Sequence, residues 1–122
     1  MKKIFMILGM LLLISCTQTE VKLSGEYKMV NAPENAEITL AFDGEGFAGI
    51  AAVNRYFGNF EQKQKNIKFN VAGTTMMMGP QNLMQVEQDY IKNLSLVDGF
   101  VLKNNTLILR TTGGTELQFK KI

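Results

Sequence analysis

Short runs of alternating apolar and polar residues, punctuated by turn-forming pairs, make up most of the chain beyond residue 21. The pairs are Asp43-Gly44, Lys65-Asn66, Asn104-Asn105 and Gly113-Gly114. Alternate side chains of a strand point to opposite faces of a sheet, and Asn and Gly tolerate the positive φ angles of tight hairpin turns. The strands expected around these turns are 38–42 with 47–53, 56–61 with 67–71, and 100–102 with 107–109 and then 117–119. The pattern predicts about seven or eight short antiparallel strands.

One segment departs from this alternation. Between Gln81 and Leu96 the apolar residues are spaced by three and four positions, with Glu87, Asp89 and Lys92 between them. That spacing is typical of an amphipathic helix, whose apolar face packs on the core. The predicted fold class is therefore mainly β, of the α+β type, with one helix before the last three strands.

The amino terminus has the pattern of a bacterial lipoprotein signal. Two lysines precede an apolar run, Ile4–Ile14, which suits a signal peptide and falls short of the roughly 20 residues of a membrane-spanning helix. Ser15 supplies a small residue at the cleavage site, and Cys16, the one cysteine of the chain, follows it. The LISC string at 13–16 resembles a lipobox, in which the cysteine thiol takes a diacylglyceryl group. The alternative is an ordinary cleaved signal peptide with an incidental cysteine.

These features divide the chain into a signal peptide (1–15), a lipidated cysteine with its tether (16–21) and one exported domain (22–122). Two or more acyl chains on Cys16 would hold the domain at a membrane, since a single chain gives only marginal binding. Thr17 is not the aspartate that retains many lipoproteins at the inner membrane. We therefore expect a lipid-anchored protein of the bacterial cell envelope, at the periplasmic face of the outer membrane if the host is Gram-negative.

Composition narrows the functions that the exported domain can have. Without Lys2 and Lys3 the 13 basic residues of the chain become 11, which equals the number of acidic residues. A neutral domain with scattered charges has no electrostatic footprint for nucleic acid. The chain has no histidine, the commonest general base and metal ligand, and one cysteine cannot form an intramolecular disulfide. We expect a monomer that binds neither nucleic acid nor a cofactor.

Two residue groups could carry chemistry, and for both we prefer a structural role. Carboxylates that could form a catalytic pair stand mostly at turns or on the solvent face of the helix, where charged residues normally lie. They are Asp43, Glu45, Glu61, Glu87, Asp89 and Glu116. Met76, Met77 and Met78, with Met84 nearby, could offer soft ligands to copper(I), but successive side chains of a strand face opposite ways, and methionine usually fills gaps in a core. We therefore expect no catalytic residues, no metal site and no enzyme, and we place these methionines under the helix.

Two strings and one helix residue form a further pattern. They are GIAAVNRYFGNF at 49–60, TTMMMGP at 74–80, and Glu87. This combination resembles the META domain family, which includes HslJ-like heat-inducible bacterial lipoproteins and carries G-x-x-x-C-N-R-Y-x-G-x-Y, T-T-x-M-x-C-P and a helix glutamate. The resemblance implies a curved, barrel-like sheet with the helix packed against it, an association with stress, and no established catalytic residues. The family-pattern positions are Gly49, Val53, Gly58, Thr75, Gly79, Pro80 and Glu87.

The chain departs from the family pattern at two positions. Where the pattern has cysteines, this sequence has Val53 and Gly79. The joint loss suits a paired role, because one orphan thiol would be a liability in an oxidising compartment. The resemblance therefore implies that Val53 and Gly79 are neighbours in space, with Cα atoms near the separation of about 4.4–6.8 Å that a disulfide requires.

The stretch Asn54-Arg55-Tyr56 is a candidate recognition patch, in which Arg55 would bind an anion or a carboxylate. The structural alternative has three parts. Asn54 would make a turn hydrogen bond, Arg55 would pair with Glu87 or another carboxylate, and Tyr56 would pack in the sheet.

Two functional classes stay open for the exported domain. The first, which we favour, is a membrane-anchored, non-catalytic binding or assembly module that acts on an envelope protein. The second is a carrier or sensor that binds an apolar ligand or lipid inside the barrel, and a cavity of more than a few hundred cubic ångströms would favour it. Large apolar side chains can fill a small barrel completely. Those expected to do so are Phe42, Phe47, Phe60, Phe69, Phe100 and Phe119.

Overall fold

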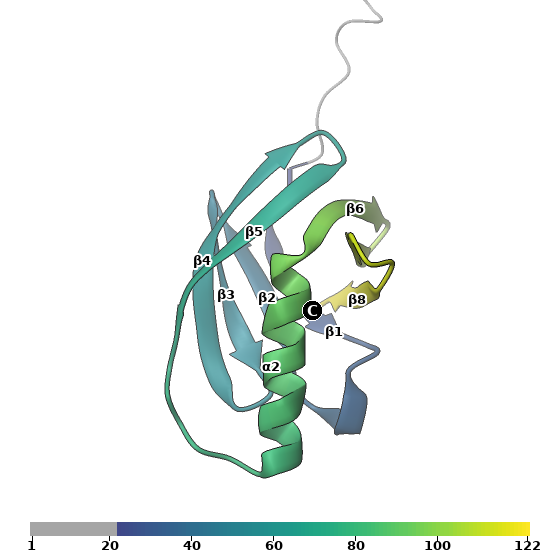
Figure 1. Cartoon of the computed structure of the whole chain (residues 1–122). Helices are drawn as coiled ribbons and strands as arrows, with labels where there is room; N and C mark the ends of the chain where they lie inside the picture. Colours follow the sequence, from purple (N-terminus) through teal and green to yellow (C-terminus); the bar gives the residue numbers. More distant parts are fainter. Residues whose placement is uncertain (1–21) are drawn as a thin grey trace, which may run out of the picture.

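Each alternating run of the sequence forms a strand in the computed structural model, which describes residues 22–122. The expected signal peptide, Cys16 and the tether lie outside the described residues. The strands are β1 Gly25–Met29, β2 Thr39–Asp43, β3 Gly46–Ala51, β4 Asn54–Lys63, β5 Asn66–Thr74, β6 Val97–Lys103, β7 Thr106–Thr111 and β8 Glu116–Lys121. Each pairs with the next, and β1 also pairs with β8, so the sheet closes into an eight-stranded antiparallel barrel (Figure 1). The predicted fold class is confirmed.

The helix α2, Gln81–Ser95, ends one residue before the expected boundary and begins directly after Pro80. It joins β5 to β6, which pair at a single register position, Asn66 with Gly99. The helix packs against β5 beside this weakly paired seam, and the short 3-10 helix η1, Pro33–Asn35, contacts it from the β1–β2 connection (Figure 1). The residues that α2 buries are Val86, Glu87, Tyr90 and Leu94. The expected amphipathic helix is present, and its apolar face closes the side of the barrel.

Aromatic side chains fill the interior of the barrel. Phe42 packs edge-on against Phe60 with ring centroids 5.2 Å apart, and Phe47 packs against Phe69 at the same separation. The six phenylalanines that were expected to fill the barrel are all buried. Rings at these separations touch one another, as side chains do in the close-packed interiors of folded proteins.

The structure corrects the turns of the first two hairpins. The two-residue turns are Gly44-Glu45 and Gln64-Lys65, each one residue away from the predicted Asp43-Gly44 and Lys65-Asn66. Gln64 even adopts a φ of 58°, a left-handed conformation that its side chain does not favour. Burial decides these registers, because a slip of one residue would turn the apolar face of a strand to the solvent.

Of the two remaining predicted turns, one is confirmed and the other is wrong. Asn104-Asn105 joins β6 to β7 as predicted. Gly113-Gly114 is not a two-residue turn, because β7 ends at Thr111 and β8 begins at Glu116. Hydrogen bonds between Thr111 and Thr115 in both directions close this longer connection.

The methionine string does not lie in the core. Met76, Met77 and Met78 belong to the connection between β5 and α2, and their exposed fractions are 91%, 51% and 90%. The placement of these side chains under the helix is therefore wrong. The strand alternation used to argue it does not apply, because β5 ends at Thr74, before the string begins.

Candidate functional site

A buried carboxylate joins the helix to the turn between β3 and β4. The Glu87 Oε1 atom accepts hydrogen bonds from the backbone N–H groups of Val53, at 3.1 Å, and Asn54, at 2.6 Å. Its Oε2 atom accepts one from Asn54 Nδ2 at 2.7 Å. Three donors thus satisfy oxygen atoms that burial would otherwise leave unpaired. The placement of Glu87 on the solvent face of the helix is wrong.

The side chain of Asn54 ties a third segment to this carboxylate. Its Oδ1 atom accepts hydrogen bonds from Met77 N at 2.5 Å and from Thr75 Oγ1 at 2.9 Å. Its Nδ2 atom also donates to the backbone oxygen of Met77 at 3.3 Å. Asn54 therefore holds β4, α2 and the β5–α2 connection together. The family-pattern residues Thr75 and Glu87 serve this network, which is structural.

Tyr56 and Tyr90 form a second buried polar contact. Their hydroxyl oxygens lie 2.6 Å apart, and the Tyr56 hydroxyl also donates to the backbone oxygen of Thr39 at 2.6 Å. Burial raises the pKa of both phenols above the ordinary value of 10.0. Both groups therefore stay neutral near pH 7 and supply no base in that range.

The candidate recognition patch does not exist as a group of three residues. Asn54 is 3% exposed and Tyr56 is 1% exposed, so neither side chain can reach a ligand. Arg55 alone points outward, and its guanidinium does not pair with Glu87, whose carboxylate bonds the β3–β4 turn. The structural alternative is right for Tyr56, which packs in the sheet, and wrong for the Arg55–Glu87 ion pair.

Two of the three glycines at family-pattern positions, Gly49 and Gly58, allow backbones to approach closely. A Cβ atom on Gly49 would lie 2.1 Å from the backbone oxygen of Thr39, and one on Gly58 would lie 2.0 Å from that of Asn70. Both distances are far shorter than atoms can approach without bonding. A residue with a Cβ atom would therefore clash with the neighbouring backbone, so both positions require glycine. Gly58 stands where the register between β4 and β5 shifts. These glycines serve the curvature and closure of the barrel.

Val53 and Gly79 are neighbours in space. A Cβ atom built on Gly79 would lie 3.5 Å from the Cβ of Val53 and 2.8 Å from its Cγ2. Disulfide-bonded cysteines have Cβ atoms about 3.5–4.5 Å apart. The contact that the resemblance implied is therefore present, with valine methyl groups where the family pattern places a sulfur atom.

This contact predicts that a disulfide can be restored. The double variant Val53→Cys with Gly79→Cys, made without the leader and with Cys16→Ser, should form an intramolecular bond on oxidation. Closing a loop of this length should raise the free energy of unfolding by up to about 3 kcal/mol, less any strain in the bond. Urea unfolding with and without a reductant measures the gain on a single protein. Free thiols after oxidation, or disulfide-linked dimers, would contradict the assigned geometry.

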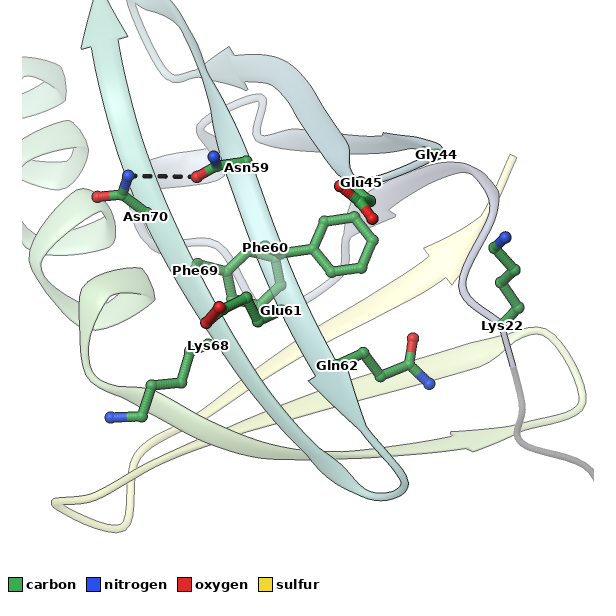
Figure 2. Close-up of a pocket in the computed structure, with 10 residues that line it drawn as sticks. All are labelled: Lys22, Gly44, Glu45, Asn59, Phe60, Glu61, Gln62, Lys68, Phe69 and Asn70. Carbon is green, nitrogen blue, oxygen red and sulfur yellow. Dashed lines mark hydrogen bonds between the residues drawn. The ribbon is translucent and has the colours of Figure 1, made fainter.

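A groove of about 990 Å³ opens at the end of the barrel where the described chain begins (Figure 2). The β4–β5 hairpin extends beyond the last pair that joins it to β3, Gly46 with Asn59, and so stands above the β2–β3 turn. The residues that line the groove are Lys22, Gly44, Glu45, Asn59, Phe60, Glu61, Gln62, Lys68, Phe69 and Asn70. The groove exceeds the few hundred cubic ångströms that would favour a carrier, it is open to solvent, and two of the core phenylalanines, Phe60 and Phe69, form part of its lining. Sequence reasoning missed it, because its residues come from distant segments.

An exposed apolar surface lies on the outer side of β4. Phe57 is 51% exposed and stands two residues from Arg55 on the same face of the strand. Thr75 hydrogen-bonds to the backbone of Arg55, and Met76 and Met78 follow it. We call Arg55, Phe57, Met76 and Met78 the Phe57 surface. Strand alternation places Phe57 and Arg55 on one face, so these two residues of the surface could have been predicted from the sequence. The two methionines could not.

Two features are absent from residues 22–122. No group of three or more His, Cys, Asp or Glu side chains in this range could hold a metal ion. No helix in the same range has the length and apolar character needed to cross a membrane.

Comparison with known protein families matches residues 18–122 to the META domain. The NMR structure of a protein from Burkholderia xenovorans shares the fold, with a TM-score of 0.68 and 19% identity over 87% of this chain and 96% of that one. The crystal structure of a DUF4847 family protein from Bacteroides vulgatus gives a TM-score of 0.61 and 13% identity over 80% and 92%. No match was found among curated proteins. At these identities the two structures support the fold alone.

Proposed function

Since this chain belongs to the META domain family, we propose that it is a membrane-anchored, non-catalytic binding module of the bacterial cell envelope. Lipid on Cys16 would hold it at the membrane, and the Phe57 surface would engage an envelope protein. The anchor is supported by the lipobox-like string at 13–16 and by the position of this cysteine directly after an apolar leader.

Two observations carry the binding role: Phe57, Met76 and Met78 are exposed, and Thr75, which precedes Met76, hydrogen-bonds to the backbone of Arg55. The one ion pair within the described part of the chain lies elsewhere, so Arg55 has its guanidinium available. Aromatic residues, methionine and arginine are the side chains enriched at protein interfaces. The hydrogen bonds from Met77 and Thr75 to Asn54 hold the surface in place, which lowers the entropy cost of binding.

The partner that suits this surface is a protein with an apolar side chain beside a carboxylate. The apolar side chain would pack against Phe57 and the methionines, and the carboxylate would accept two parallel hydrogen bonds from the guanidinium of Arg55. The alternative, a carrier with its ligand inside the barrel, is disfavoured because the phenylalanine rings fill that space.

The anchor is tested by Cys16→Ser. Without the thiol no lipid can attach, so the protein should leave the detergent phase in detergent partitioning while its β-rich circular dichroism spectrum is unchanged. The unaltered chain is the control. A Cys16→Ser protein that stays in the detergent phase would instead indicate uncleaved anchoring through Ile4–Ile14.

The partner surface is tested with a photo-crosslinking residue at Met76 in living cells. We expect a discrete crosslinked protein band that weakens about fivefold or more in Arg55→Glu, because fivefold corresponds to about 1 kcal/mol and arginine is enriched among the interface residues that contribute this much. The matched control is Lys92→Glu, the same change of charge at an exposed helix position. The same bands from a probe at Thr112, which lies on the β7–β8 connection, would contradict a specific surface.

A further inference from the structure

We propose that the outer face of strands β6, β7, β8 and β1 docks on the anionic lipid surface of the membrane that carries the anchor. The inference rests on the proposed lipid anchor at Cys16 and concerns a side of the barrel that the Phe57 surface does not include. We call Lys28, Lys103, Lys120, Val30 and Val101 the lysine face.

The three lysines stand in one row across four neighbouring strands. Lys28 on β1 is paired with Lys120 on β8. Thr106 on β7 continues the row, since it is paired with both Lys120 and Lys103. Each lysine follows a residue that packs in or against the core, so strand alternation turns all three side chains outward, and all three are exposed. Three strand spacings of about 4.8 Å separate the ends of the row, so it spans about 15 Å.

None of these lysines is neutralised within the described part of the chain. The ion pair found there joins Arg110 to Glu116 at 3.5 Å, and Glu26, two residues before Lys28, forms none. Lys28 and Lys120 instead stand directly opposite each other, an arrangement that is destabilising for like charges. An anionic surface outside the protein would offset this repulsion.

A second row, beside the lysines, is largely apolar. Gln118 on β8 accepts a backbone hydrogen bond from Val30 at 2.8 Å and is paired with Ile108 on β7. Ile108 is in turn paired with Val101 on β6. Val30 is 59% exposed and Val101 is 36% exposed. Exposed apolar groups beside ammonium groups suit a membrane surface, where the first lie among the head groups and the second contact phosphates.

The tether allows this docking, and the barrel sets its consequence. Gly25, where β1 begins, lies nine residues after Cys16, and nine residues span at most about 32 Å. An anchored domain therefore stays close to the membrane and needs only to turn its lysine face toward it. Strand β4, which carries Phe57, lies four strands from β8 in either direction around the closed barrel. A docked domain thus presents the Phe57 surface away from the membrane, where an envelope protein can reach it.

The test uses the chain from Cys16 onward, because residues 22–122 close the barrel and hold its hydrophobic core. Its one cysteine, Cys16, is coupled to a maleimide lipid in vesicles, which supplies the anchor by chemical means. The chain has no tryptophan, so Val30→Trp reports from the lysine face and Met78→Trp from the Phe57 surface.

The readout is quenching of tryptophan emission by brominated lipid. In vesicles that contain phosphatidylglycerol, the emission of Val30→Trp should be quenched and shifted to shorter wavelength, and that of Met78→Trp should be unchanged. In vesicles of phosphatidylcholine alone, which carry no net charge, Val30→Trp should lose most of this quenching. Added salt should reverse the quenching as well, because it screens the attraction between exposed charges.

The charges are tested by a triple variant in the Val30→Trp protein, Lys28→Gln with Lys103→Gln and Lys120→Gln. The docking equilibrium should fall about fivefold for each lysine removed, since a basic residue near an anionic membrane contributes about that factor. The matched control removes the same charge from exposed positions outside the lysine face, by Lys63→Gln with Lys68→Gln and Lys92→Gln. Equal losses in both variants would mean that net charge governs docking, and would overturn the proposal.

A single variant, Lys120→Glu, separates docking from folding. It should weaken the quenching, while the urea midpoint stays the same or rises, because a carboxylate opposite Lys28 replaces a repulsion with an attraction. A midpoint that falls together with the quenching would mean that Lys120 serves the fold, and would overturn its role in docking.

Three other results would also overturn the proposal. They are an absence of quenching at Val30→Trp, equal quenching in the two kinds of vesicle, and stronger quenching of Met78→Trp than of Val30→Trp. The chemical anchor replaces the natural lipid, so a failure of lipidation shows only in the partitioning of Cys16→Ser. A failure of the partner surface shows only in the crosslinking from Met76.

Discussion

Leu94→Asp should lower the free energy of unfolding by about 4 kcal/mol, because it places an unpaired carboxylate between helix and barrel. Leu94 lies near the end of α2 and is 0% exposed. The substitution removes the packing of a large apolar side chain and buries a charge without a partner. Loss of the contact would release the helix from β5, which pairs with β6 only at Asn66 and Gly99.

The measurement is urea unfolding, followed by far-ultraviolet circular dichroism. Lys92→Asp is the matched control, since it introduces the same residue on the exposed face of the same helix. It should change the free energy of unfolding by less than about 0.5 kcal/mol. Similar midpoints for the two variants would mean that α2 buries a different face.

Glu87→Ala should lower the free energy of unfolding by about 3 kcal/mol. The sequence pattern alone would not predict this loss, because it places the charged Glu87 among the polar residues of the helix. The carboxylate accepts hydrogen bonds from the backbone of Val53 and from the backbone and side chain of Asn54. Its removal leaves these donors buried without partners. The β5–α2 connection should loosen as well, because Asn54 also holds Met77.

Thermal and urea unfolding give the size of this effect, with Asp89→Ala as the control on the exposed side of α2. The free energy of unfolding of Glu87→Gln should lie between those of Glu87→Ala and Asp89→Ala. The glutamine amide keeps one acceptor oxygen, but its NH2 group faces the donor Nδ2 of Asn54. Faster amide exchange at Met77 in Glu87→Ala would report the loosened connection. An unaltered stability of Glu87→Ala would contradict the network.

Local spacing predicted the elements well and their ends less well. The turn Asn104-Asn105 was correct because both residues tolerate turn geometry and the flanking strands pair around them. Asn66 is a favourable turn residue and was expected in the turn, but β5 begins at Asn66 and the turn uses Gln64 instead. Burial of a whole strand face outweighs the preference of one turn residue, so register prevailed.

The candidate site was predicted only in part. The family pattern led to Glu87, Asn54 and the pair Val53 and Gly79, but no local rule shows that Glu87 points inward. Polar residues between the apolar positions of a helix look alike in a sequence. Only the folded chain brings the donors of the β3–β4 turn to within 3.1 Å of this carboxylate.

The sequence by itself determined the strands, the helix and, through the family pattern, the contact of Val53 with Gly79. These depend on the order and spacing of residues along the chain, which periodicity and pattern can read. Tertiary structure alone decided the groove and the exposure of Met76, Met77 and Met78. Lys22, Gly44 and Phe69 lie far apart in the chain and line one groove only when the barrel closes, so their spacing carries no signal of the site.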